Sequence, residues 1–379
     1  MACCWFSLLE LYRLHRQNDE FNRVLRLSRR RRNLIVASIS EKKIAMKFVR
    51  RHFLNLAAGA AVLLAFLVSA LPVLAQELPP TQERPPTWAY PVAPKDYVPP
   101  ADDGTVRHLP GSTKGYTLTD IRNLFFALDW FPEGHAPMPP IVAQGRKPNL
   151  RPCGTCHRPE GVGGPENASL AGLPTAYLLR QIDDFRTGAR TTGVKERAHV
   201  FRMISALKEL TEDEIKQVVA YYAAMKLSAR MKVVESETVP ITYVPNWYYT
   251  SKLDGKTEPL GNRIIEIPDD EENFVNRDYR VTFTAYVPPG SVARGEQLVA
   301  GKEAERVPAC ATCHGDGLKG IDSIPPIAGR SPSMIVRQLY EFKYGIRHGS
   351  MAEPMKASTS QMTTKDMTSI AAYLATLTP

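Results

Sequence analysis

The chain has 379 residues, of which 44% are hydrophobic and 23% charged, so it is long enough for two or three small domains and is neither fibrous nor broadly disordered. Its formal net charge of +9 arises in residues 1–75, which hold 13 basic and 4 acidic residues, whereas the remainder holds 35 of each. The remainder therefore lacks the excess of basic residues that marks a nucleic-acid binder.

Residues 46–75 have the pattern of a secretory signal peptide. A basic segment over 46–52 precedes an apolar run over 54–71, and residues 73–75 fit the small-residue cleavage pattern before Gln76. We therefore expect export to the periplasm and interpret residues 1–45 as an upstream extension from an over-long gene assignment. The alternative is an uncleaved leader that acts as a membrane anchor, since the apolar run approaches the roughly 20 residues that span a bilayer.

Residues 76–139 form an N-terminal extension rich in proline and tyrosine. The segment Tyr97-Val98-Pro99-Pro100 is typical of it, and a similar segment, Tyr286-Val287-Pro288-Pro289, occurs much later in the chain. Such composition favours extended chain. A short helix is expected next, around Pro140 to Gly145.

Two Cys-x-x-Cys-His pentads, at 153–157 and 310–314, contain every cysteine after Cys4. A c-type haem group needs this spacing, because two intervening residues let one turn present both thiols to the same porphyrin edge, where they form thioethers, and the adjacent histidine reaches the iron. The alternative is one closed zinc site built from both pentads. The haem interpretation predicts two covalent haem c groups, attached to Cys153, Cys156, Cys310 and Cys313, with His157 and His314 as iron ligands.

After the first pentad, the apolar spacing predicts helices. One runs from Thr175 to Gly188, with the glycine placed to end it. Another begins at Thr211, which is followed by three acidic residues suited to a first turn.

The inter-domain segment 229–290 comes next. In it, residues 239–249 are rich in β-branched and aromatic side chains and predict an edge strand or hairpin arm. Trp247, Tyr248 and Tyr249 either cover a haem edge, dock a partner protein or pack this insert onto the domains.

The second pentad opens a repeat of the first domain. Shifted by 157 residues, the first pentad falls on the second, and the register continues without a gap through Gly163 on Gly320, Arg180-Gln181 on Arg337-Gln338, and Arg190 on Arg347. Helices are expected over 291–301, 333–345 and 363–377. The four arginines are candidates to pair with haem propionates, the alternative being salt bridges on the helix surfaces.

One methionine is aligned between the copies, at an offset of 152. Met203 falls on Met355, which makes this pair the best candidates for the second axial ligand of each iron. Methionine is otherwise a common core residue, and His199, His348 and Met351 are the competing ligands. A thioether ligand raises the reduction potential and closes the iron to oxygen or peroxide.

The order of these features resembles class I cytochrome c, and two copies in one exported chain resemble the tandem dihaem cytochromes of the cytochrome c4 type. The resemblance covers residues 140–228 and 291–379. It implies a mainly α fold, two small helical domains related by a pseudo-twofold and joined by a long irregular or β-containing segment, with electrons moving between the haems. The length of segments 76–139 and 229–290 departs from the family.

The expected function is electron transfer between periplasmic or membrane redox partners, such as a donor dehydrogenase or quinol-oxidising complex and an acceptor oxidase or reductase. No catalytic residues and no nucleic-acid partner are predicted. Two alternatives stay open. One is a haem-bearing subunit of a larger oxidoreductase, and the other is a dihaem enzyme such as a peroxidase or a thiosulfate-type oxidoreductase, which needs an iron that is open or changes ligand.

Overall fold

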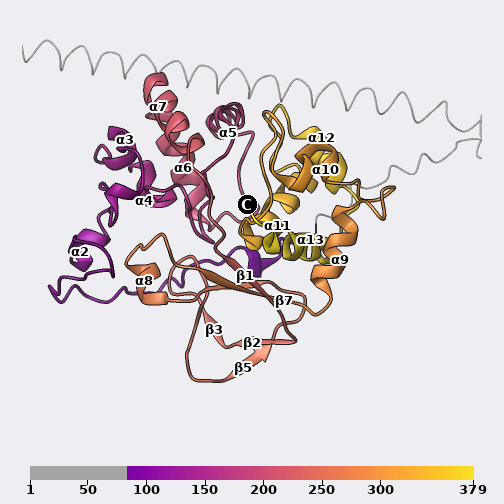
Figure 1. Ribbon diagram of the computed structural model, residues 1–379, viewed down its shortest axis with the longest axis horizontal. Helices are drawn as coiled ribbons and strands as arrows, with labels where there is room; N and C mark the ends of the chain where they lie inside the picture. The colour runs from indigo at the N-terminus through magenta and orange to yellow at the C-terminus, as the bar shows by residue number, and fades with distance from the viewer. Residues whose placement is uncertain (1–82) are drawn as a thin grey trace, which may run out of the picture. The chain divides into compact units, whose positions relative to one another are not determined.

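The computed structural model describes residues 83–379. Most of its helices form one group within residues 140–223 and a second within 291–376, and strands lie between the two groups in the sequence (Figure 1). The expected signal peptide at 46–75 and the upstream segment 1–45 lie outside the described residues. Within 83–379, no helix is both long and apolar enough to cross a bilayer.

The first helical group has the expected starts and stops. Its helices are α3 (Pro140–Ala143), α4 (Cys153–His157), α5 (Thr175–Thr187), α6 (Ala198–Lys208) and α7 (Glu212–Ala223). Gly188 ends α5 in the left-handed conformation at φ 80°, as predicted. Thr211 caps α7, because its side chain accepts a hydrogen bond from Glu214 N while the Glu214 carboxylate accepts from Thr211 N. Buried Leu178 and Tyr222 belong to the core that joins α5 to α7.

The second group repeats this plan with a longer first helix. Its elements are α9 (Ser291–Val299), α10 (Ala311–His314), η3 (Asp316–Leu318), α11 (Pro332–Lys343), α12 (Glu353–Thr359) and α13 (Thr364–Thr376). Thr363 and Asp366 form a capping box at the start of α13, as expected for a helix opening there. α9 packs closely against α13 at Gly295, where a β-carbon would overlap the backbone oxygen of Ser369. The α9–α13 contact therefore needs glycine at this position.

The segment between the helical groups forms three small sheets. Its elements are β1 (Met231–Glu235), β2 (Thr238–Pro240), β3 (Thr242–Tyr243), β4 (Thr250–Ser251), β5 (Thr257–Pro259), β6 (Ile265–Pro268), α8 (Glu271–Val275) and β7 (Phe283–Val287). β2 pairs with β5, β3 pairs with β4, and the largest sheet has the order β1-β7-β6. The predicted strand or hairpin arm at 239–249 thus corresponds to β2 and β3, which pair in two different sheets.

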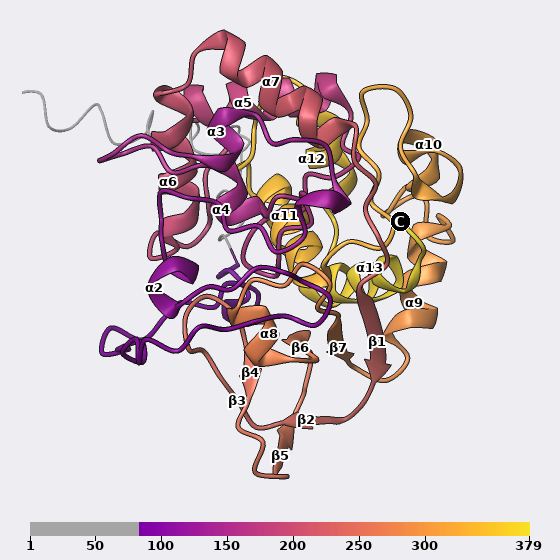
Figure 2. The same ribbon diagram turned by 60° about the vertical axis from the view of Figure 1, so that its left-hand side comes forward.

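The sheet β1-β7-β6 is part of the core of the second helical group. β7 runs parallel to β1, with Met231 opposite Phe283, and antiparallel to β6. Ala285 and Val287 alternate inward and are fully buried in the same cluster as α9, α11 and α13. Figure 2 shows β1 beside α13. The insert is therefore packed onto the second domain and is not a free linker.

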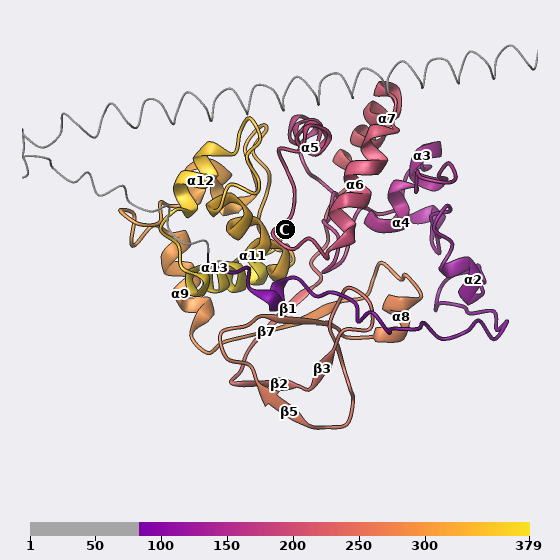
Figure 3. The same ribbon diagram turned by 180° about the vertical axis from the view of Figure 1, so that it is seen from behind.

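The N-terminal extension contacts the second helical group and the insert. Its short helical elements are η1 (Thr87–Ala89), α2 (Leu118–Ile121) and η2 (Pro132–Gly134). η1 lies against α11 (Figure 3), where Ala89 and Tyr90 are buried in the core of the second group. Farther along, Trp130 is buried in a hydrophobic cluster formed within the extension. Its Nε1 donates to the backbone oxygen of Asn276, 2.7 Å away. This hydrogen bond ties the extension to the insert.

Candidate functional site

The first pentad lines a cavity of about 790 Å³. Cys153, Cys156 and His157 enter it from α4, and Met203 enters from α6. Both thiols are free, and burial raises the pKa of Cys153 to about 12. The second pentad lines a separate cavity of about 440 Å³, together with Met355 on α12. The structure thus brings each predicted cysteine pair, histidine and methionine to one pocket.

Each pentad histidine is held in the tautomer that suits an iron ligand. The Nδ1 atom of His157 lies 2.8 Å from the backbone oxygen of Ala168, and Nδ1 of His314 lies 2.8 Å from that of Pro325. A carbonyl only accepts hydrogen bonds, so Nδ1 carries the proton and the lone pair is on Nε2. Burial lowers the pKa of both histidines, which favours the neutral ring. Both sites therefore fit a haem iron on Nε2.

Sequence reasoning missed these two carbonyl groups, although a signal for them existed. Ala168 and Pro325 are separated by the same 157 residues that separate His157 from His314. The residue types differ, so a comparison of side chains passes over the pair. Because the backbone oxygen makes the contact, the position is what matters, and the repeat supplies the position.

The competing axial ligands are placed differently from one another. His199 lines the first pocket, its Nδ1 has no hydrogen-bond partner, and its ring meets Trp247 edge-on with centroids 4.6 Å apart. Burial, followed by the charge of Arg197, lowers the pKa of His199 to about 3. Met351 lines the second pocket but is 56% exposed, whereas His348 lines neither of the two. Each pocket thus holds its aligned methionine and one competitor.

A hydrogen-bonded cluster with twofold character separates the two pockets. Arg190 donates to the side-chain oxygens of Gln181 and Gln338, both at 2.8 Å, and Arg347 donates to the same two oxygens at 2.7 and 2.9 Å. Arg190 and Gln181 correspond to Arg347 and Gln338 in the repeat. Tyr177 completes the cluster, since its hydroxyl accepts from Arg347. Tyr177, Gln181, Arg190 and Gln338 line both pockets, so the two cavities share a wall.

The four repeat arginines make no ion pair with a carboxylate within residues 83–379, so the expected alternative of surface salt bridges is wrong. Arg180 and Arg337 instead cross to the other domain, where they donate to the backbone oxygens of Ser323 and Pro165 at 2.6 and 2.7 Å. Burial and the neighbouring Arg347 lower the pKa of Arg190 to about 10. The guanidinium groups of Arg190 and Arg347, which have no carboxylate partner within residues 83–379, fit a pair of haem propionates.

The wall of the first pocket includes residues from outside the repeat. Tyr97 comes from the extension, and Trp247 and Tyr248 come from the insert. Trp247 packs the insert onto the first domain, since its ring meets that of His199 on α6, whereas Tyr248 and Tyr249 pack on other residues of the insert. The role of these aromatic side chains in covering a haem edge stays a prediction. The second pocket receives no residue of the extension, and it is about half the size.

Arg158 distinguishes the first pocket from the second. It follows the pentad at φ 67° and ψ 155°, and its counterpart is Gly315 at φ 77° and ψ 175°. This region of backbone conformation belongs almost entirely to glycine, and another residue there costs about 1–3 kcal/mol. Arg158 lines the first pocket, and its Nη1 is buried without a partner. The first site thus has a buried cation directly after its pentad, where the second site has glycine.

We expect Arg158→Gly to lower the reduction potential at the first pocket without lowering the free energy of unfolding. Glycine relieves the backbone strain, and loss of the cation stabilises the oxidised state by on the order of 1 kcal/mol, which is about 40 mV for one electron. Spectroelectrochemical titration and denaturant unfolding measure the two effects. Lys319→Gly, at an exposed residue near the second pentad, is the control. Equal potentials in wild type and Arg158→Gly would contradict this role.

Comparisons with known proteins agree with this geometry. The cytochrome c family model matches residues 142–226 and 292–378. Cytochrome c4 of Pseudomonas aeruginosa is 25% identical over 227 residues, which is 59% of this chain and 82% of that protein. The thiosulfate dehydrogenase electron acceptor of Thiomonas intermedia is 26% identical over 233 residues, or 60% of this chain and 79% of that one.

Two solved structures align with part of this chain. Thiosulfate dehydrogenase from Marichromatium purpuratum aligns with a TM-score of 0.40 and 28% identity, over 60% of this chain and 36% of that one. Cytochrome c4 from Pseudomonas stutzeri aligns with a TM-score of 0.39 and 22% identity, over 59% of this chain and 93% of that one.

Proposed function

Because the chain is a tandem class I cytochrome c with two covalently bound haem c groups, we propose that it carries electrons between redox proteins, with one haem group in each pentad-lined pocket. Bound haem iron supplies one-electron chemistry by alternating between ferrous and ferric states. The domains that hold the groups are assigned to residues 140–228 and 291–379. The shared wall of the two pockets is the observation that carries the proposal, since it places both sites within one unit.

The pentads and the two aligned methionines have distinct roles in this proposal. The thiols of Cys153, Cys156, Cys310 and Cys313 form the thioethers. His157 and His314 bind iron through Nε2, a role supported by their Nδ1 hydrogen bonds. Met203 and Met355 would each supply a second ligand to the iron of their pocket, a role supported by their places in the pockets. Two closed irons would make the chain a carrier and not a catalyst.

The cluster at the shared wall orients the propionates in this proposal. Arg190 and Arg347 hold their side chains through Gln181 and Gln338, so the guanidinium groups are already positioned before a carboxylate binds. Guanidinium groups paired with propionates in this wall would keep the two sites at a fixed separation and exclude water between them. Such rigidity suits electron exchange between the domains, because little reorganisation accompanies each transfer.

Export and the partners belong to the same proposal. The leader at 46–75 would direct the chain to the periplasm, where the donor is a dehydrogenase or a quinol-oxidising complex and the acceptor an oxidase or reductase. A second candidate is a haem-bearing subunit of a thiosulfate-oxidising complex, which is favoured by relatives named as electron acceptors of thiosulfate dehydrogenase. In that case the extension and the insert would be the docking surfaces.

Stoichiometric reduction and turnover assays test the carrier function. We expect the oxidised protein to take up two electrons per chain in an anaerobic titration and to show no turnover with peroxide or thiosulfate alone. Adding a thiosulfate dehydrogenase with its substrate would then reduce the protein if the second candidate holds. Rapid turnover of peroxide or thiosulfate by the isolated chain would contradict the carrier function, because it requires an iron that is open or exchanges its ligand.

A further inference from the structure

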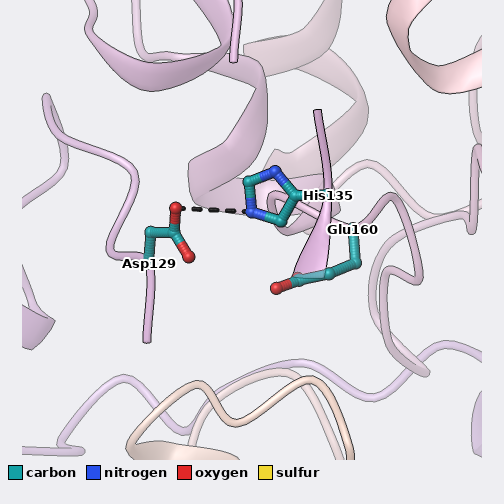
Figure 4. Close-up of side chains that lie close together, drawn as sticks. All are labelled: Asp129, His135 and Glu160. Carbon is teal, nitrogen blue, oxygen red and sulfur yellow. Dashed lines mark ion pairs between the residues drawn. The ribbon is translucent and has the colours of Figure 1, made fainter. Parts of the chain in front are cut away.

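Three side chains that could ligate a metal meet outside both haem pockets. Asp129 and His135 come from the extension, and Glu160 lies three residues after His157. One ligand atom from each lies within 4.8 Å of the other two. Figure 4 shows the two carboxylates on either side of the imidazole ring, with the Asp129 carboxylate paired to one ring nitrogen. No spacing in the sequence links these residues.

The hydrogen bonds of His135 fix its tautomer. Nδ1 lies 2.8 Å from the backbone oxygen of Ala136, which can only accept. It also lies 3.1 Å from the hydroxyl of Tyr221, which in turn donates to the backbone oxygen of Pro159 at 2.9 Å. Nδ1 therefore carries a proton. Nε2 faces Asp129 Oδ2, 3.3 Å away, and must give up its proton to offer a lone pair to a metal ion.

Within residues 83–379, the only ion pair in this cluster joins His135 to Asp129. The side chain of His135 is 6% exposed and that of Asp129 is 12% exposed, and neither His135 Nε2 nor Glu160 Oε2 has a hydrogen-bond partner. Burial raises the pKa of Glu160 to about 7, and the Asp129 carboxylate raises the pKa of His135 to about 9. The cluster therefore brings together two carboxylates and one imidazole with few other partners, and these are groups that a divalent cation binds.

We propose that Asp129, His135 and Glu160 bind a divalent transition-metal ion of the zinc class. One imidazole and two carboxylates are a common ligand set for zinc, and three protein ligands leave a fourth position for water. The 3.3 Å between Nε2 and Oδ2 matches the edge of a tetrahedron with bonds of about 2.0–2.1 Å. The contact of Nδ1 with a backbone oxygen is the usual support of a metal-binding histidine.

The ion would fasten the extension to the first haem domain. Asp129 and His135 precede the first helix of that domain, and Glu160 belongs to the turn that follows the first pentad. A bound ion would therefore hold this turn through residues that do not line the pocket. It would stabilise the first domain and leave the second unchanged, since the second repeat has Gly317 at the position of Glu160.

Zinc binding to the dihaem protein tests the proposal. The protein is stripped with a chelator, dialysed against zinc chloride with calcium in excess, and measured for zinc and iron by mass spectrometry. We expect one zinc for two irons. His135→Ala and the isosteric Glu160→Gln should each raise the Kd for zinc by at least about 100-fold. His108→Ala, at an exposed histidine of the same extension, should leave it unchanged.

Thermal unfolding with and without zinc gives a second measurement that does not depend on the variants folding equally well. Zinc should raise the Tm of wild type and of His108→Ala, and it should not raise the Tm of Glu160→Gln. The proposal is overturned if wild type binds no zinc at equivalent iron content, or if His108→Ala loses zinc as His135→Ala does. A proton-sharing cluster would give the first of these results.

Discussion

Replacing Cys153 and Cys156 together by serine removes one of the two covalent haem groups and leaves the other in place. Serine has no thiol to add across a haem vinyl group, so the first pocket loses its attachment while the second keeps Cys310 and Cys313. Denaturing mass spectrometry should show the chain with the mass of one haem, and the iron content should fall from two to one. Loss of haem packing from a cavity of about 790 Å³ should also unfold the first domain.

The reciprocal variant is the matched control. Serine at Cys310 and Cys313 should also leave one haem mass, and the four-cysteine variant should leave none. If either double variant retained two covalent haem groups, or if the cysteines instead bound one zinc between the pentads, the assignment of one haem group to each pentad would be contradicted.

Replacing Met203 or Met355 by leucine lowers the reduction potential at that pocket and opens the iron. Leucine keeps the volume, which limits the loss of stability to less than about 1.5 kcal/mol, but it has no sulfur to stabilise ferrous iron. Because axial ligands set haem potentials over about 0.8 V, we expect a fall on the order of 0.1 V. Carbon monoxide binding to the reduced protein should appear at the altered site.

The competing ligands provide the controls for this experiment. His199→Ala and Met351→Ala should keep the weak absorption band from sulfur to ferric iron, whereas each leucine variant should lose half of it. If Met351→Ala lost the band and Met355→Leu kept it, the ligand of the second pocket would be Met351, which also lines that pocket.

The residues that line the two pockets could be proposed from the sequence because local patterns mark them, and their roles as ligands stay predictions. The pentads point to the cysteines and histidines, and the repeat, which resumes at an offset of 152, points to Met203 and Met355. Helix ends followed from capping residues, as with Thr211 and Gly188. The dihaem family and the mainly α fold inferred from these patterns are confirmed by the family model and by the relatives named cytochrome c4.

Nonlocal packing could not be read in the same way. β1 and β7 are joined in parallel across the whole insert, and a parallel pairing has no turn signal in the sequence. Tyr90 enters the second domain and its hydroxyl donates to Glu341, a contact between residues far apart in the chain. The strained Arg158 and the cluster around His135 depend on such placement too. Sequence patterns describe neighbours along the chain, whereas these features join segments brought together by folding.

The central claim is that two closed, histidine- and methionine-ligated haem groups share one wall in an electron carrier. Spectroelectrochemistry of the exported holoprotein, recorded at the haem bands and at the band from sulfur to ferric iron, tests it most directly. We predict two one-electron transitions at two irons per chain, with both ferric irons contributing to the sulfur band. A single transition with one iron, or a ferric protein without that band, would contradict the claim.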